Sequence, residues 1–193
     1  MNQPEPRPGS GRRQLVLVVL VFLGPLLVAA WLYFGSGGWK PAGTSNHGAL
    51  LEPIVNLGDA LPGSALGEIA ENAWLLVYAR DRPCDDACEN ALIRLRQSRL
   101  MLGNDMSRVQ RVFLHGPVAP DRVFIEEQHA GLITTRDRGL AELLERKRPA
   151  QLAPGGIYLI DPLTNLVMYF SPELEPREMV EDLKHLLELS RIG

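Results

Sequence analysis

Hydrophobic positions along the chain form one long N-terminal run, followed by shorter runs that polar turns separate. Four continuous apolar runs predict strands buried on both faces, as in a sheet covered by helices: residues 74–78, 109–114, 157–160 and 166–170. Three stretches repeat apolar positions at helical spacing and predict helices: residues 87–102, 139–147 and 176–192. Residues 66–71 predict a further short helix, and residues 121–129 fit either a helix or irregular structure.

The helical spacing also predicts which side chains face the core. In the first long helix the inward set is Cys88, Ala91, Leu92, Leu95 and Leu102. In the second helix it is Leu140, Leu143 and Leu144, and in the last helix it is Met179, Val180, Leu183, Leu186 and Leu187. The opposite, polar face of the last helix carries Glu181, Asp182, Lys184, Glu188 and Arg191.

The order of these elements predicts an α/β fold. A strand, a helix and a second strand form a β-α-β unit with a right-handed crossover, so that helices cover a central sheet. Residues 161–165 form a turn between the last two strands and predict an antiparallel hairpin, which a final helix follows. The sequence therefore predicts a thioredoxin-like architecture, a central mixed sheet flanked by helices.

The N-terminal run, residues 15–34, holds about 20 residues without a charge, which is enough to cross a hydrocarbon core about 30 Å thick. Gly24 and Pro25 interrupt it, which membrane helices tolerate. Three arginines precede the run and only Lys40 follows it closely, so the positive-inside rule places the N-terminus in the cytoplasm. The predicted division is a cytoplasmic tail (1–13), a transmembrane helix in contact with lipid (14–34), a periplasmic linker (35–66) and a thioredoxin-like domain (67–193).

Two other interpretations of the N-terminus are weaker. A cleaved signal peptide would have a shorter apolar core, and residues 28–30 form a poor cleavage site. Arg12 and Arg13 resemble a twin-arginine export signal, but a basic pair before an apolar run is usually a topology signal. We therefore expect a single-pass protein of the cell inner membrane with its folded domain in the periplasm.

Composition narrows the classes of function. The chain has 193 residues, 46% apolar and 22% charged, with a net charge of -3, which suits one globular domain with an added segment. It excludes a disordered or collagen-like chain. Nucleic-acid binding would call for a basic stripe, and the mild acidity gives no reason to expect such a partner.

Cys84 and Cys88, the only two cysteines, stand four residues apart where the first strand gives way to the first long helix. Thiols at this spacing lie on one side of a helix, so they can form a disulfide or hold one soft metal ion. A purely structural disulfide is the competing interpretation. Its five-residue ring contributes only about 2 kcal/mol, against about 3 kcal/mol for a 15-residue loop, so the spacing favours a functional pair.

Charges around the pair act in opposite directions. A helix N-terminus favours a thiolate, and Arg80 and Arg82 would help if they folded over the sulfurs. Asp85 and Asp86 stabilise the helix start but repel a thiolate beside them. We expect Cys84, the more exposed cysteine, to be the attacking thiol and Cys88 to resolve the mixed disulfide, with modest activation.

The pattern of strand, Cys-x-x-x-Cys and helix, followed by IYLIDPLTNLVMYF and a terminal helix, resembles the membrane-anchored SCO (SenC-like) proteins. The resemblance covers residues 74–189 and the N-terminal anchor. It implies a thioredoxin fold facing the periplasm, a role in assembling the copper A centre of cytochrome c oxidase, and Cu(I) as a candidate metal. It implies as partner the copper-site subunit of the oxidase or another copper or redox assembly factor.

The chain departs from the SCO pattern at two places. The family's Cys-Pro-Asp-x-Cys-Pro here runs from Cys84 to Glu89 as CDDACE, which keeps both cysteines and Asp86 but loses both prolines. The family's copper-binding histidine, just before the Tyr-Leu-Ile-Asp-Pro strand, has no counterpart in residues 151–156. A copper site would be left with two thiolates.

No other residue is an obvious third copper ligand. We expect His115 and His129 to be surface or packing residues, Met168 to be core, and His47 and His185 to be solvated. The leading hypothesis is therefore assembly of the oxidase by thiol-disulfide exchange through Cys84 and Cys88. The alternatives are a Cu(I) carrier using both cysteines and an unidentified ligand, or a non-catalytic assembly factor. Whether Pro154 is a cis-proline facing the dithiol stays open.

Overall fold

The computed structural model describes residues 10–35, 46–60, 63–64, 66–69 and 73–190. The chain divides into two compact units, Met1–Ser45 and Asn46–Gly193. Most of the predicted cytoplasmic tail, and residues 36–45 of the predicted linker, lie outside the described residues.

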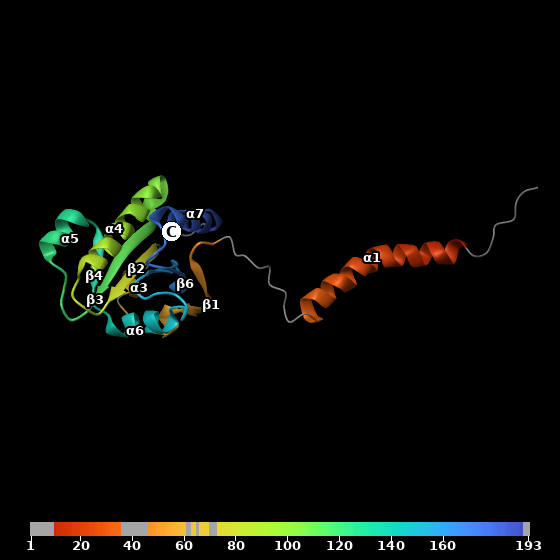
Figure 1. Cartoon of the computed structure of the whole chain (residues 1–193), viewed down its shortest axis with the longest axis horizontal. Helices are drawn as coiled ribbons and strands as arrows, with labels where there is room; N and C mark the ends of the chain where they lie inside the picture. Colours follow the sequence, from red (N-terminus) through yellow and green to blue (C-terminus); the bar gives the residue numbers. More distant parts are fainter. Residues whose placement is uncertain (1–9, 36–45, 61–62, 65, 70–72, 191–193) are drawn as a thin grey trace, which may run out of the picture. The chain divides into compact units, whose positions relative to one another are not determined.

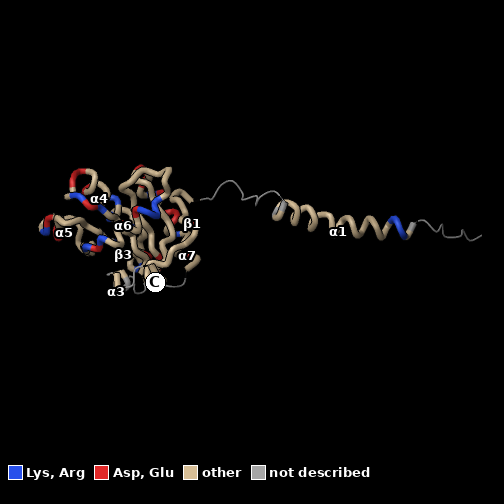
Figure 2. Tube along the Cα trace, turned by 90° about the horizontal axis from the view of Figure 1, so that it is seen from below, with Lys and Arg blue, Asp and Glu red and all other residues tan. Residues whose placement is uncertain are grey.

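The first unit is a single helix, α1 (Ser10–Gly35), of 26 residues with Pro25 inside it. At 1.5 Å per residue it is about 39 Å long, more than the roughly 30 Å of a hydrocarbon core. Its 22 residues from Gly11 to Leu32 are long and apolar enough to cross a membrane. Figure 2 shows the helix tan along its length, with basic residues at its N-terminal end. The predicted apolar helix is present, with the length and composition that a membrane span needs.

The second unit is built on a six-stranded mixed sheet in the order β1-β6-β5-β2-β3-β4. The strands β2, β3 and β4 run parallel, whereas β5, β6 and β1 add antiparallel pairs. The strand bounds are β1 (Ala49–Asn56), β2 (Trp74–Arg80), β3 (Val109–His115), β4 (Leu132–Thr135), β5 (Ile157–Ile160) and β6 (Asn165–Phe170). All four predicted strands are present, and the thioredoxin-like fold class is confirmed.

Helices cover both faces of the sheet (Figure 1). The helices α4 (Asp86–Met101) and α7 (Pro176–Leu189) pack on one face, and α6 (Arg138–Lys147) packs on the other. Shorter helices are α2 (Leu57–Ala60), α3 (Leu66–Ile69), η1 (Gly103–Arg108) and α5 (Arg122–Gln128). Along β2, Leu76 and Tyr78 enter the first core while Leu75 and Val77 enter the second. Burial on both faces explains why the sequence of β2 is continuously apolar.

The structure adds two edge strands that the hydrophobic pattern did not predict. The strand β4 has only four residues, too few for a clear alternation. The strand β1 lies inside the segment expected to be a linker; it contains Pro53 and pairs with β6 only near its two ends, with a register shift between Leu50 and Val55. Within sheets, proline occurs on edge strands, where its missing N–H costs no hydrogen bond of the ladder. Because proline is also typical of loops, the sequence of β1 resembles a loop.

Helix boundaries differ slightly from the predictions because of capping. Asp85 caps α4, so the helix begins at Asp86, one residue before the predicted start. Asp121 caps α5, which makes a helix of the ambiguous stretch. The helix α4 ends at Met101, one residue before the predicted end, and the chain continues as the 3-10 helix η1, with Gly103 at a φ of 62° that glycine adopts readily.

Asp182 corrects the prediction for the last helix. It was expected on the solvated face, but it is only 5% exposed. Its carboxylate accepts hydrogen bonds from the backbone N–H groups of His47 (3.2 Å) and Gly48 (2.7 Å). The His47 ring is exposed, as expected, and lies 3.2 Å from Glu181. Asp182 thus fastens the segment before β1 to α7, a contact between residues more than 130 positions apart that helical periodicity does not encode.

Candidate functional site

Cys84 and Cys88 are joined by a disulfide, with their Cα atoms 5.2 Å apart. The pair lies just beyond the carboxyl end of β2, the usual place for sites in α/β sheets. Cys84 immediately precedes the capping residue of α4, and Cys88 belongs to the first turn of that helix. The sequence therefore predicted the location correctly, but Cys84 is outside the helix rather than on its first turn.

The two sulfurs differ in accessibility. Cys88 is fully buried among the side chains that α4 and α7 place against the sheet. Cys84 is only partly buried and packs at the margin of the same cluster. A partner molecule can therefore approach Cys84 more easily than Cys88, as expected from the sequence.

Asp85, between the two cysteines in sequence, binds both the backbone of the helix start and a neighbouring arginine. Its carboxylate accepts the N–H of Cys88 at 3.1 Å and also pairs with the guanidinium of Arg80. The hydrogen bond from Cys88 and the charge of Arg80 lower the pKa of Asp85, against the opposing effect of desolvation. Arg80 donates a second hydrogen bond to the hydroxyl of Tyr78 at 3.4 Å. The charge of Arg80 is thus directed to Asp85 rather than to a sulfur.

A cleft of about 1180 Å³ opens beside the disulfide at the carboxyl ends of β2 and β3. Asp85 and Ala87, the neighbours of the cysteines in sequence, line it, whereas the described lining does not include the cysteines themselves. Arg82 is exposed and also lines the cleft. The disulfide therefore lies at the margin of a cavity large enough for a segment of another polypeptide.

Gly116, which follows β3 and lines this cleft, packs closely against the backbone of the loop after β2. A Cβ atom on Gly116 would lie 2.1 Å from the carbonyl oxygen of Asp81, which follows β2. The two loops after the parallel strands are therefore in direct contact, and only glycine fits between them.

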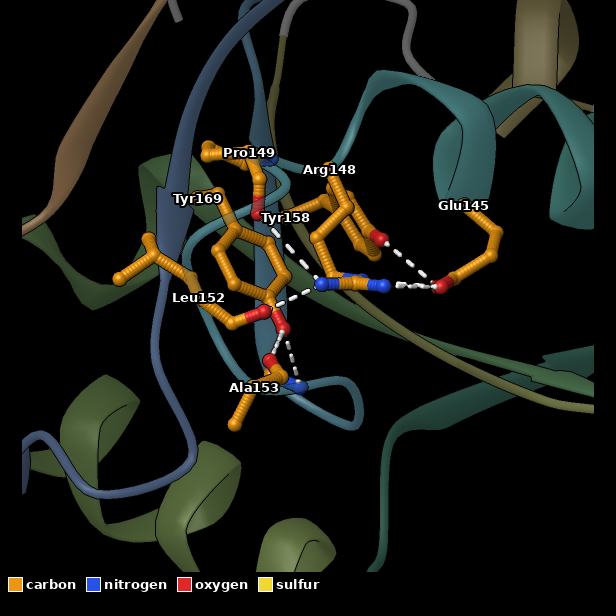
Figure 3. A network of polar contacts seen from close by, with 8 residues as sticks. Glu145, Arg148, Pro149, Leu152, Ala153, Tyr158 and Tyr169 are labelled. Atoms are coloured by element: carbon orange, nitrogen blue, oxygen red, sulfur yellow. Dashed lines mark hydrogen bonds and ion pairs between the residues drawn. The ribbon is translucent and has the colours of Figure 1, made fainter.

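The loop before β5 forms another wall of the cleft, and a polar network holds it (Figure 3). Arg148 binds the carboxylate of Glu145 (2.9 Å from Nε) and donates to the carbonyl of Leu152. Tyr169 donates its hydroxyl to the carbonyl of Ala153 at 2.6 Å and accepts the N–H of Gly156 at 2.9 Å. These bonds give the loop a defined shape.

This loop occupies the place where the SCO pattern has its histidine. A Cβ atom on Gly156 would lie 2.1 Å from the carbonyl oxygen of Phe170, so the loop approaches β6 too closely for any side chain there. Burial raises the pKa of both Tyr158 and Tyr169, which keeps these hydroxyls protonated as donors. Among the described residues, the cis peptide bond is Glu52–Pro53, so Pro154 is not a cis-proline.

His115 lines the cleft beside the disulfide, but among the described residues the histidines form no metal site with the cysteines. Imidazole Nδ1 of His115 lies 2.9 Å from the carbonyl oxygen of its neighbour Gly116. His129 is buried and packs on Phe124, and Met168 is core, as expected. His185 is exposed, also as expected. Within the described part of the chain, no three His, Cys, Asp or Glu side chains gather as a metal site would require.

Sequence reasoning missed two features of this region. The sequence left open whether Arg80 folds over the sulfurs, and it did not predict that Arg80 pairs with Asp85. The network around Arg148 and Tyr169 connects three parts of the chain: the end of α6, the loop that precedes β5, and the strand β6. No local sequence motif predicts it.

Fold and site together define a membrane-anchored thioredoxin-fold protein with a cysteine pair at the start of α4. The chain belongs to the transmembrane-like, thioredoxin-like family. The model of that family's C-terminal domain matches residues 74–190, and the model of its transmembrane-like N-terminal domain matches residues 4–36. The N-terminal match agrees with α1 as the membrane anchor. No curated protein sequence matches the chain.

Solved structures similar to this chain include three Sco proteins. Apo Sco1 of Thermus thermophilus is 18% identical, with 76% of this chain and 99% of that chain covered and a TM-score of 0.51. Copper-bound ScoI of Arabidopsis thaliana is 18% identical, with coverage of 64% and 89% and a TM-score of 0.50. Yeast Sco1 is 15% identical, with coverage of 64% and 85% and a TM-score of 0.51. At these identities the likeness establishes a shared SCO-like fold.

Proposed function

We propose that this protein is a membrane-tethered thiol-disulfide exchange protein in which Cys84 and Cys88 carry the reaction. The observation that carries the proposal is the disulfide between a partly exposed and a fully buried cysteine, at the start of α4 and beside a large cleft. An exchange reaction needs one sulfur that a partner can reach and a second that only the first can reach.

The reaction begins with the reduced pair. The thiolate of Cys84 attacks one sulfur of a disulfide in a partner protein, forming a mixed disulfide and releasing one partner thiolate. The thiolate of Cys88 then attacks the sulfur of Cys84, which releases the second partner thiolate and forms the Cys84–Cys88 disulfide. Two electrons pass from the pair to the partner. A dithiol of another protein must reduce the pair again before the next cycle.

The same geometry supports modest rather than strong thiolate activation. The positive end of α4 favours a thiolate, but the carboxylate of Asp85 lies between the cysteines and takes the charge of Arg80. A weakly activated dithiol suits reduction of particular partner disulfides better than general oxidation.

For the biological partner, we propose the copper-site subunit of cytochrome c oxidase or another copper or redox assembly factor. The support is the shared fold with Sco proteins, two of them solved with copper bound. Reducing the cysteines of the copper A site before metal is loaded is a task that the cysteine pair can perform without the missing histidine. The domain would act in the periplasm, with α1 in the inner membrane.

Trapping distinguishes the roles of the two cysteines. We expect detergent-solubilised full-length Cys88→Ser protein to accumulate a mixed disulfide with a peptide carrying the disulfide of the copper A motif. The matched Cys84→Ser protein should accumulate none, because its remaining thiol is buried. Non-reducing electrophoresis and mass spectrometry measure the adduct. Equal adduct formation by both variants, or full oxidase activity in cells that carry only Cys84→Ser protein, contradicts the mechanism.

The Cu(I) carrier is the alternative, with copper as cargo. Thiolates are soft ligands that suit Cu(I), but the described residues add no imidazole to the two sulfurs. Titration of the reduced full-length chain with Cu(I) tests this alternative: absence of tight one-to-one binding excludes it. A non-catalytic assembly factor would keep its function when both cysteines are replaced by serine.

A further inference from the structure

Arg111 is a buried charge that no carboxylate among the described residues balances. It lies on β3, faces α4, and is only 3% exposed. Its Nη2 donates to the carbonyl oxygen of Ala130 at 2.6 Å, while Nε and Nη1 are buried without a hydrogen-bond partner among the described residues. Buried charges are normally paired, because removing an unpaired ion from water is strongly unfavourable.

Two further arginines surround the same place. On α4, Arg96 donates to the carbonyl oxygen of Gln128, and Arg99 donates to that of Val109 at 2.6 Å. A guanidinium has five N–H donors, so Arg96 and Arg99 each keep further donors after making these bonds. Within the described residues, neither Arg96, Arg99 nor Arg111 lies in ion-pair range of a carboxylate.

The electrostatic environment reflects this surplus of positive charge. Burial, and then the charges of Arg99 and Arg96, lower the pKa of Arg111. Burial, and then the charges of Arg96 and Arg111, lower the pKa of the neighbouring His129, so its imidazole is neutral at physiological pH. Both ring nitrogens of His129 are buried and unpaired among the described residues. Further positive charge is thus unfavourable at the junction of α4, β3 and α5.

A pocket of about 250 Å³ opens at this junction, and all three arginines line it. One carboxylate, that of the exposed Glu127, also lines it, so positive charge predominates. Pockets for drug-sized ligands begin at about 300 Å³, so this one suits a smaller molecule. It lies at the far end of α4 from the cysteines, which occupy the start of that helix.

We propose that this pocket binds a small oxyanion, the class that includes phosphate, sulfate and carboxylate. The planar fork of a guanidinium matches two oxygens of such a group, and three guanidinium groups converge here. The anion would take the unpaired Nε and Nη1 donors of Arg111 and neutralise the repulsion among the three arginines. Binding would tie α4, β3 and the end of α5 together, independently of the cysteine chemistry.

Thermal unfolding of the detergent-solubilised full-length protein tests the site. Sodium phosphate, sodium sulfate and sodium acetate are titrated separately against sodium chloride at equal pH and ionic strength. We expect at least one oxyanion to raise Tm in a saturable manner beyond the effect of chloride. The order of the three probes tells a tetrahedral oxyanion from a carboxylate.

Matched variants locate the effect. Arg111→Met should lower the affinity for the effective probe at least tenfold, whereas Arg177→Gln, an exposed change on α7, should leave it unchanged. If Arg111→Met does not fold, Arg96→Gln on the surface of α4 gives the same comparison. No saturable response beyond chloride in the unmodified protein, or a full response in the folded pocket variant, overturns the proposal.

Discussion

At the scale of single residues, Asp85 links the helix start to the chemistry of the cysteines. It caps α4 through the N–H of Cys88, and it pairs with Arg80. A residue that only capped the helix could equally be asparagine, serine or threonine. The charge of Asp85 adds a repulsion that either thiolate must overcome, so this residue opposes activation of the pair.

We therefore predict that Asp85→Asn makes the reduced protein more reactive. Asparagine keeps an oxygen that can accept the N–H of Cys88, but it removes the negative charge beside Cys84 and releases Arg80. Because solvent screens this exposed charge, alkylation of Cys84 at neutral pH should accelerate only modestly, about two- to fivefold. The rate of iodoacetamide labelling of reduced protein, followed by mass spectrometry, measures this effect.

The control makes the same change of charge elsewhere. Asp105→Asn lies in η1, beyond the opposite end of α4, where Asp105 pairs with Arg108. It should leave the labelling rate unaltered. Labelling of Asp85→Asn at or below the unmodified rate would show that Asp85 does not restrain the thiolate.

Residue-scale prediction from sequence succeeded where one local rule decides the outcome. The spacing of Cys84 and Cys88 and the helical position of Cys88 were enough to predict which sulfur is buried. The solvated position expected for Asp182 was wrong, and no partner was predicted for Arg80. Their partners depend on the path of a long side chain or of a remote segment, which hydrophobic periodicity does not contain.

At the scale of elements, the core strands and long helices follow from the hydrophobic pattern, whereas the edges of the sheet do not. The strands β2 and β3 are buried on both faces, so their sequences are distinctive. The edge strand β1 is mostly exposed, and part of its position comes from Asp182 on α7 rather than from its own sequence. Tertiary contacts decide where such an element lies.

We predict that Asp182→Ala weakens the attachment of β1. The substitution leaves the N–H groups of His47 and Gly48 without their acceptor, and an unsatisfied buried donor costs about 1–3 kcal/mol. Tm should fall by several degrees, and hydrogen exchange should accelerate at residues 48–50. Thermal unfolding and hydrogen-exchange mass spectrometry of the full-length protein measure these effects.

Glu181→Ala is the matched control, because Glu181 neighbours Asp182 but is exposed, where it contacts the His47 ring and pairs with Arg177. Surface pairs contribute about 0–1 kcal/mol, so its effect should be small. If the two variants lose the same stability, the buried carboxylate is not what holds the strand.

At the scale of the whole molecule, the division into an apolar helix and a folded unit determines where the cysteines can act. A helix that stays in the membrane confines the domain to one membrane surface, near membrane-bound partners. The proposed location of the domain outside the cytoplasm rests on Arg7, Arg12 and Arg13, which precede the helix and favour a cytoplasmic N-terminus under the positive-inside rule. Orientation and retention are therefore the properties on which the proposed function depends.

We predict opposite labelling of the two sides of α1 in intact cells by a maleimide that does not cross the inner membrane. With Cys88→Ser, the freed Cys84 should react from outside. With both native cysteines replaced by serine, Ser10→Cys should react only after the inner membrane is broken. Both proteins should keep their N-terminal residues and resist alkaline extraction, because the positive-inside rule and an uncleaved apolar helix act together. Labelling of Ser10→Cys in intact cells would show that the orientation is opposite to the predicted one. Loss of the N-terminal residues would show that the helix is a cleaved signal peptide.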